Sequence, residues 1–439
     1  MRIFCLSSSL HAEASAAAAR DPFVREVVAC LGAASVPVEI CDAPGRLYGS
    51  PDVIYIRTGG TEGAFKAAFT AEDGTLALPQ GPFLLLTSGK SNSLAASMEI
   101  LSFLRQQGRV GEILHGSPAY VAARICTHIQ GRTQTDEPGL DTDVQGRPGE
   151  CAAGRRAFDA KAWKPRLAGK RLGIVGRPSD WLISSDVDPA VARRELGLDL
   201  LDIPMDELVR EIRRGGYDLP AEVSWPGGGP ISASFQPRFG RPLTPEAFEG
   251  AMDIYGALCR LVARYRLDGL TLRCFDLLTE VGNTGCMALA LLNAQGIPSS
   301  CEGDVPALVS MMVAHALTGC CGFQANPARI DPERGEMLLA HCTVPLDMIR
   351  CGEYDTHFES GIGVAVRGEL AEGPVTIFKI APDLRQCFAA DATLVRNLAE
   401  RDLCRTQVVL RAPGTARYFL TDSIGNHHII IPGHHAGSL

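Results

Sequence analysis

The chain has 439 residues, 46% of them hydrophobic and 21% charged, and its formal net charge is −8 at pH 7. Domains typically span about 100 to 200 residues, so two or three domains are expected. The negative charge argues against nucleic acid or a membrane surface as partner, because no block of Lys and Arg offsets it.

The N-terminal residues lack the features of a secretion signal, because the apolar run 3–6 is short and no cationic stretch precedes it. No uninterrupted apolar stretch reaches the roughly 20 residues that a membrane helix needs. We therefore expect a cytoplasmic protein whose fifteen cysteines are reduced and mostly buried. The adjacent Cys320 and Cys321 lack the two-residue spacer of thiol metal sites.

The first part of the chain alternates short apolar runs with helical stretches. The runs cover residues 2–6, 36–41, 52–57 and 83–87. This alternation predicts a doubly wound α/β domain with a parallel sheet.

Two polar turns interrupt this segment, with the sequences RTGGTE and TSGKSNS. Each follows a strand and precedes a helix, which is where open parallel sheets place their ligand-binding loops. Ordinary turn chemistry is the alternative. On the first interpretation, substrate hydroxyls would be held by Arg57, Thr58, Glu62, Ser91 and Asn92.

Residues 130–165 lose periodicity and are rich in Gly, Pro and Asp, which is typical of a linker. A second α/β pattern begins near residue 170 and includes an amphipathic helix over 244–265. Its last two strands, 269–275 and 297–301, each lead into a helix. We therefore predict an N-terminal α/β domain with linker over 1–165 and a second α/β domain over 166–325.

Beyond residue 326 the helical periodicity disappears. Short β-rich runs separated by turn residues take its place, at 337–341, 362–367, 375–380, 407–411, 417–420 and 428–431. This spacing predicts an antiparallel β-barrel over 326–439.

Acidic residues follow the last two strands of the second α/β pattern. Glu280 comes after the first strand, and Asp304, together with Glu302, comes after the second. Both turns open on the same edge of a parallel sheet, so Glu280 and Asp304 are expected to converge there. The alternative is that each is a helix N-cap or a loop charge.

Histidines are concentrated toward the end of the chain, where six of the ten fall after residue 340. Two carboxylates and one imidazole would suit Mn²⁺, Mg²⁺ or Co²⁺. The alternatives are core imidazoles or a surface cluster. No phosphate-binding or dinucleotide motif is present, so no nucleotide cofactor is expected.

These groups suit one reaction class, the interconversion of an aldose and its ketose. One carboxylate would act as base and another as acid, while a divalent ion would stabilise the developing oxyanion. A non-catalytic sugar-binding module and a metal-dependent aldolase or hydrolase are the alternatives. The aldolase would use the same ligands.

At these residues the chain resembles the L-fucose/L-arabinose isomerase family. The resemblance covers most of residues 170–435 and rests on Thr279-Glu280, Asp304 in the run CEGD, His341 in AHC, and the run GNHH. It implies two α/β domains and a C-terminal barrel, assembled into homo-oligomers (trimers or hexamers) with active sites at subunit contacts.

The resemblance also implies roles for individual residues. Glu280 and Asp304 would be metal ligands and the acid/base pair, and His428 would be the histidine ligand, with His341 as a further one. Whether His427 or His428 faces the metal stays open, because neighbouring strand residues point to opposite faces. The implied substrate is a pentose or hexose such as fucose or arabinose.

Overall fold

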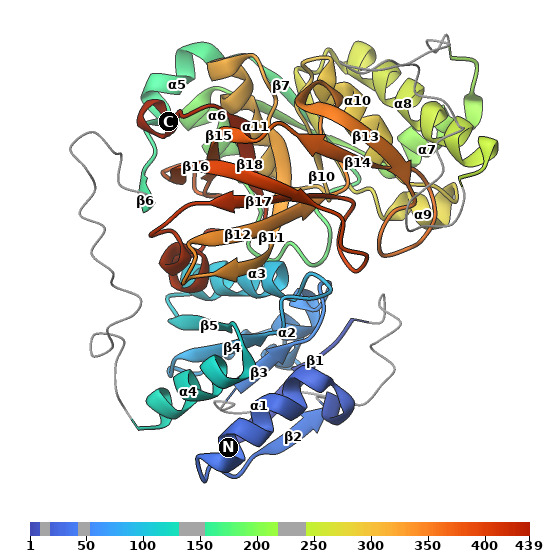
Figure 1. Ribbon diagram of the computed structural model, residues 1–439. Coiled ribbons are helices and arrows are strands. Elements are labelled where there is room, and N and C mark those ends of the chain that lie inside the picture. The colour runs from blue at the N-terminus through green and yellow to red at the C-terminus, as the bar shows by residue number, and fades with distance from the viewer. Residues whose placement is uncertain (9–17, 43–52, 131–153, 218–242) are drawn as a thin grey trace.

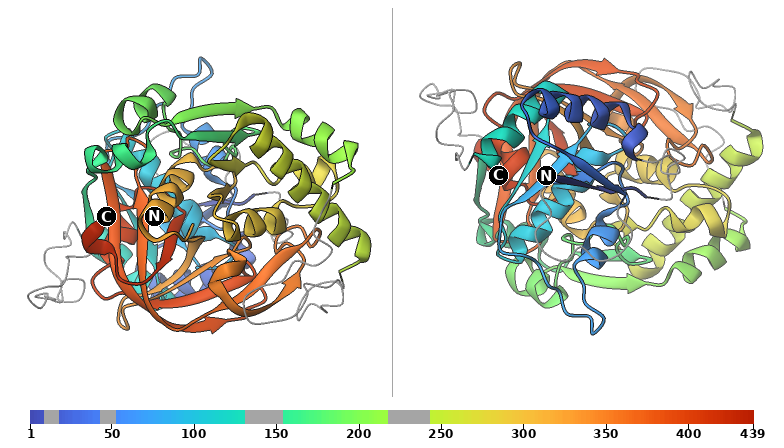
Figure 2. Two further views of the ribbon diagram at one scale, coloured as in Figure 1. Left: turned by 90° about the horizontal axis from the view of Figure 1, so that it is seen from above. Right: turned by 90° about the horizontal axis from the view of Figure 1, so that it is seen from below.

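The computed structural model describes residues 1–8, 18–42, 53–130, 154–217 and 243–439. It has two parallel sheets flanked by helices and a closed six-stranded antiparallel β-barrel, which confirms the predicted fold class (Figure 1). The first α/β part forms one layer, and the barrel and the second α/β part lie side by side on it (Figures 1 and 2). No described helix has the length and apolarity needed to cross a membrane.

The first sheet has five parallel strands in the order β2-β1-β3-β4-β5. Its strands are β1 (Arg2–Leu6), β2 (Glu39–Asp42), β3 (Val53–Ile56), β4 (Phe83–Thr87) and β5 (Gly111–His115). Its helices are α1 (Pro22–Ala33), α2 (Glu62–Ala68), α3 (Ser93–Gln106) and α4 (Pro118–Ile129).

Helix α3 joins this layer to the rest of the molecule. Its residues 93–104 are all buried, because it lies between the first sheet and barrel strand β11 (Phe323–Asp331). A helix that is buried on every side needs small or apolar residues around its whole circumference, and the sequence SLAASMEILSFL largely provides them. Glu99 is the charged exception.

The second sheet is parallel, with the strand order β10-β9-β7-β8. Its strands are β7 (Arg171–Val175), β8 (Asp199–Ile203), β9 (Gly269–Leu272) and β10 (Ser299–Cys301). The accompanying helices are α5 (Ala160–Leu167), α6 (Pro189–Leu196), α7 (Met205–Arg214), α8 (Pro245–Tyr265), α9 (Asp276–Glu280), α10 (Cys286–Ala294) and α11 (Val305–Thr318). The predicted helix over 244–265 is confirmed by α8, whose N-cap Thr244 accepts a hydrogen bond from the Ala247 amide.

The barrel strands follow the order β15-β18-β11-β12-β17-β16, and the pairing of β15 with β16 closes the barrel. Besides β11, they are β12 (Glu336–His341), β15 (Gly373–Ile380), β16 (Gln386–Leu398), β17 (Thr406–Arg411) and β18 (His428–Pro432). A separate ribbon pairs β13 (Ile349–Asp355) with β14 (Ala365–Leu370).

Several expected elements differ from the structure. The strand predicted over 417–420 is wrong, because the π-helical turn Tyr418–Asp422 occupies this place. The strand predicted over 362–367 corresponds to β14, which lies outside the barrel. Within the predicted linker, residues 131–153 lie outside the described residues, whereas residues 154–157 form β6 (Gly154–Ala157), which pairs with β16.

Candidate metal centre

Three side chains from separate elements meet at the junction of the second sheet and the barrel. Glu302 follows β10, His341 ends β12 and His427 directly precedes β18. Each offers one potential ligand atom, and these atoms all lie within 4.8 Å of one another. The three residues are therefore placed to hold one ion.

The outer nitrogens of both imidazoles are fixed by neighbouring side chains. His427 Nδ1 lies 2.8 Å from an Asp304 carboxylate oxygen, and His341 Nδ1 lies 3.0 Å from the Thr343 hydroxyl. The inner Nε2 atoms of His427 and His341 face the same Glu302 oxygen, at 3.4 and 3.7 Å. In metal sites of proteins, a hydrogen-bond partner on the nitrogen that does not bind the metal orients each histidine ligand, and Asp304 and Thr343 are such partners here.

The backbone at Glu302 is in the left-handed region, with φ 65°, which is uncommon for a residue with a side chain. Gly303 follows with φ 74°, and a Cβ there would lie 2.4 Å from the Arg177 carbonyl oxygen. The Trp181 indole donates a 2.6 Å hydrogen bond to Glu302 Oε2. Strained backbone of this kind persists where the surroundings hold it, and here it aims the carboxylate at the two histidines.

Electrostatics at the centre favour a positive charge between the carboxylates. Burial by itself would raise the pKa of Glu302, but His427 and His341 outweigh it and hold that pKa well below its usual range. Burial would likewise lower the pKa of His427, yet Glu302 and Asp304 raise it to about 9.

The donor set fits a divalent cation. His427 Nε2 is buried without a hydrogen-bond partner in the described part of the chain. Two imidazoles with one carboxylate suit Mn²⁺ or Co²⁺ better than Mg²⁺, which prefers oxygen ligands. Such an ion would replace the proton on His427.

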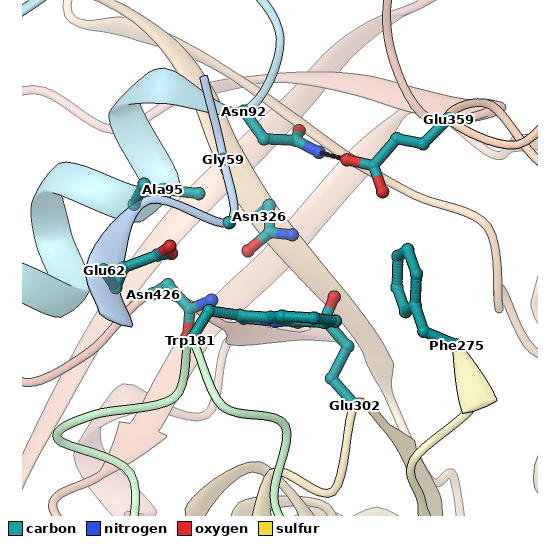
Figure 3. A pocket seen from close by; sticks show the side chains of 12 residues that line it. Gly59, Glu62, Asn92, Ala95, Trp181, Phe275, Glu302, Asn326, Glu359 and Asn426 are labelled. Carbon is teal, nitrogen blue, oxygen red and sulfur yellow. Dashed lines mark hydrogen bonds between the residues drawn. The ribbon is translucent and has the colours of Figure 1, made fainter. Parts of the chain in front are cut away.

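A pocket lies between Glu302 and residues of the first α/β layer (Figure 3). Its cavity has a volume of about 30 Å³, which is room for about two waters. The lining comprises Gly59, Gly60, Glu62, Asn92, Ala95, Ala96, Trp181, Phe275, Glu302, Asn326, Glu359 and Asn426. It combines carboxyl and amide groups with two aromatic rings.

Polar atoms of this lining lack partners within the described residues. They are Glu62 Oε2, Asn326 Oδ1 and Asn426 Oδ1, all buried. In Figure 3, Glu62, Asn326 and Glu302 surround a common space, and the 2.8 Å hydrogen bond from Asn92 to Glu359 lies along one side of it. Burying polar groups without partners is costly, so these atoms are expected to bind a ligand or water.

Glu62 is the most enclosed carboxyl group of the pocket, with 2% of its surface exposed. Burial is the main cause that raises its pKa well above the ordinary value, and the nearby carboxyl groups of Glu99, Glu302 and Glu359 raise it further.

The two polar turns predicted to hold substrate come together. The Gly59 amide donates a 2.7 Å hydrogen bond to the Ser91 carbonyl oxygen. A Cβ at Gly59 would lie 2.9 Å from Cβ of Asn92, so this contact requires glycine. Among the five candidates, Glu62 and Asn92 line the pocket.

The other three candidates are placed differently. Arg57 forms a buried ion pair with Asp21 at 3.1 Å, and the Thr58 hydroxyl accepts a hydrogen bond from the Ser8 amide. Ser91 supplies its backbone carbonyl to Gly59 and is not part of the lining.

The structure does not bring Glu280 to the centre, contrary to the expected convergence with Asp304. Glu280 is the last residue of α9, its side chain is 46% exposed, and it faces Arg213 at 3.6 Å. The chain winds into a short helix after β9, which turns this carboxylate outward. Asp304 is fully buried and lies behind His427, where its other oxygen also caps α11 through the Ala307 amide.

His427 rather than His428 lies at the centre. His428 faces the opposite side, where it contacts the rings of Phe388, Tyr418 and Phe419 and shares a 3.0 Å hydrogen bond with the Tyr418 hydroxyl. Burial lowers the pKa of His428 to about 3, so its ring is neutral. The two histidines thus point to opposite faces, as adjacent strand residues do.

Sequence reasoning missed Trp181, Phe275, Asn326, Glu359 and Asn426 as lining residues. Trp181 and Phe275 follow β7 and β9, so the rule that placed ligand loops after parallel strands could have found them. Asn326 and Asn426 belong to the barrel side and carry no local signal.

Fold and site together define a three-part chain with a candidate metal centre at the junction of its parts. No family model matches the chain. Sulfoquinovose isomerases of Priestia aryabhattai and Priestia megaterium are each 23% identical to it over 220 residues, which is 48% of this chain and 47% of theirs. A sulfoquinovose isomerase of a Clostridium species is 30% identical over 131 residues, 29% of this chain and 28% of its own.

The chain therefore spans about half the length of the first of these curated relatives. It is a distant homologue of proteins named as isomerases.

Proposed function

We propose that the chain is a metal-dependent aldose–ketose isomerase that acts on a pentose or hexose. The observation that carries this proposal is the group of Glu302, His341 and His427 beside a pocket. Three buried polar atoms of that pocket, Glu62 Oε2, Asn326 Oδ1 and Asn426 Oδ1, lack hydrogen-bond partners within the described residues. The distant similarity to named isomerases supports the same reaction class.

In this proposal Glu302, His341 and His427 hold the cation, Mn²⁺ or Co²⁺. The ion would stabilise the negative charge that develops on the sugar oxygens. Asp304 orients His427 and is not itself a ligand. Glu280 has no part in the proposal, because its side chain lies at the surface beside Arg213.

Isomerisation also requires an acid/base group, distinct from the metal ligands, that carries the proton between C2 and C1. Glu62 and Glu359 line the pocket without belonging to the ligand group, so we assign the proton transfer to them. Asn92, Asn326 and Asn426 can donate to and accept from hydroxyl groups, which suits them to orient the sugar.

The described lining holds three glutamates and no Lys or Arg. Such a surface favours a neutral, hydroxyl-rich sugar over an anionic one, because like charges repel strongly where water is excluded. A sugar is larger than the present cavity, so binding requires side chains of the lining to shift. Fucose and arabinose fit this description.

The test is a panel of pentoses and hexoses, with sulfoquinovose included, assayed for ketose formation with Mn²⁺ and with a chelator. Ketose formed only with metal, together with uptake of solvent deuterium at C1 of the ketose, is the expected result. Binding without turnover would instead indicate a sugar-binding module, and carbon–carbon cleavage would indicate an aldolase. E62Q and E359Q should fold normally and lose at least tenfold in kcat.

Two further predictions from the sequence accompany this proposal. They are assembly into a homo-oligomer and a cytoplasmic location. Sedimentation and fractionation of cells would test them.

A further inference from the structure

A fully buried lysine lies behind the candidate metal centre. Lys379 on β15 has no exposed surface, and its ammonium has no hydrogen-bond partner among the described residues. We propose that Lys379 is a positioning residue: its ammonium anchors the Asp304 carboxylate, and through Asp304 it fixes the ring of His427. This inference rests on the proposed metal centre.

The first line of evidence is the shared oxygen. Lys379 Nζ lies 4.0 Å from Asp304 Oδ2, the same atom that bonds His427 Nδ1 at 2.8 Å. All three side chains are fully buried. A buried carboxylate needs a compensating charge, and the Lys379 ammonium is a cation that lies close enough to Asp304 Oδ2 to provide it.

The second line is packing of the backbone that leads to His427. Gly425 lies two residues before His427, and a Cβ there would lie 2.7 Å from Lys379 Cε and 3.0 Å from its Nζ. The lysine stem therefore fills the space under this segment. Lys379 thus supports His427 from two sides, through Asp304 and through the backbone at Gly425.

A second buried carboxyl group near Lys379, that of Glu99, has hydrogen-bond partners elsewhere. Glu99 on α3 also lies near Lys379, but its oxygens bond the Ser184 amide at 2.7 Å and the Ser185 hydroxyl at 3.1 Å. Glu99 is therefore satisfied by partners on the loop after β7, whereas Asp304 is directed at His427. Glu99 provides a matched control, since it is equally buried but does not contact the centre.

The experiment is a Mn²⁺ titration by calorimetry of the full chain and four variants, with melting temperatures measured in parallel. Removing an orienting partner of a metal ligand typically weakens binding about 10- to 100-fold. We expect K379M to bind Mn²⁺ at least tenfold more weakly, and E99Q to stay within threefold of the parent. D304N should weaken binding by a similar factor.

The pair D304N and D304N/K379M gives the decisive comparison and remains usable if K379M alone fails to fold. Met keeps an apolar stem under Gly425, so K379M removes the ammonium and leaves most of this packing. If the ammonium acts through Asp304, K379M in the D304N background therefore changes the Mn²⁺ affinity by less than threefold. A further tenfold loss in that background would overturn the proposal, and so would a folded K379M with parental affinity. Failure of the parent itself to bind Mn²⁺ or Co²⁺ would count against the metal centre instead.

Discussion

Metal binding at this centre should depend steeply on pH, because His427 must lose a proton first. Its pKa is raised from 6.5 to about 9 by Glu302 and Asp304, against the effect of burial. A shift of this size corresponds to roughly 3 kcal/mol. At pH 7 the imidazolium form then exceeds the neutral form by about 100-fold, which weakens the apparent metal affinity by the same factor.

The assay is Mn²⁺ calorimetry between pH 6.5 and 8.5, in two buffers with different ionisation enthalpies. The affinity should rise about tenfold per pH unit, with about one proton released per ion bound at pH 7. In D304N the imidazolium loses a partner, so the rise should shift to lower pH. An affinity that is flat across this range, with no proton release, would refute the assignment of His427 as a protonated ligand.

The same shift affects the stability of the metal-free protein. The folded pKa lies above the unfolded value, so the stabilisation is complete below pH 6.5 and is lost as pH rises toward about 9. The melting temperature of metal-free protein should therefore fall over that window, and saturating Mn²⁺ should reduce the fall. A melting temperature that rises over the window would contradict the sign of this reasoning.

Three substitutions test the placement of individual residues. H427A should abolish measurable Mn²⁺ binding. H428A should keep the affinity within threefold and lower the unfolding free energy by about 2 kcal/mol, because the buried Tyr418 hydroxyl loses the ring nitrogen that accepts its proton. E280Q should leave both the Mn²⁺ affinity and the melting temperature unchanged, since the Glu280 carboxylate is exposed. A tenfold loss of Mn²⁺ affinity would show that Glu280 takes part in metal binding. V375D should lower the free energy of unfolding, measured by chemical denaturation, by about 3 kcal/mol or more, because Val375 is buried in the barrel. Parental stability would show that the position tolerates a charge.

The sequence predicted the architecture better than the individual strands. Alternating apolar runs were sufficient to predict two parallel sheets and a barrel, because these patterns reflect burial directly. Strand β16 was missed because its interior has the sequence AADAT, which has little β propensity. Hydrogen bonding to β15, β17 and β6 stabilises the strand instead. The division of the chain at residues 165 and 325 stays a prediction.

The centre was predicted in kind but not residue by residue. Sequence spacing placed carboxylates after β9 and β10, yet it could not reveal that α9 turns Glu280 outward while the strained backbone aims Glu302 inward. The choice between His427 and His428 depends on which face of β18 meets the second sheet. That is a tertiary contact, so no local pattern could decide it.

Both carboxylate oxygens of Asp304 form hydrogen bonds. One accepts from the Ala307 amide and so caps the N-terminus of α11, and the other lies 2.8 Å from His427 Nδ1. A metal ion that binds the His427 imidazole and orders it therefore also orders the first turn of this helix, through Asp304. Amide hydrogen exchange at Val305, Ala307 and Leu308 should slow when the ion is present, although none of these residues belongs to the ligand group. The start of α11 would then report on metal occupancy without any measurement of turnover.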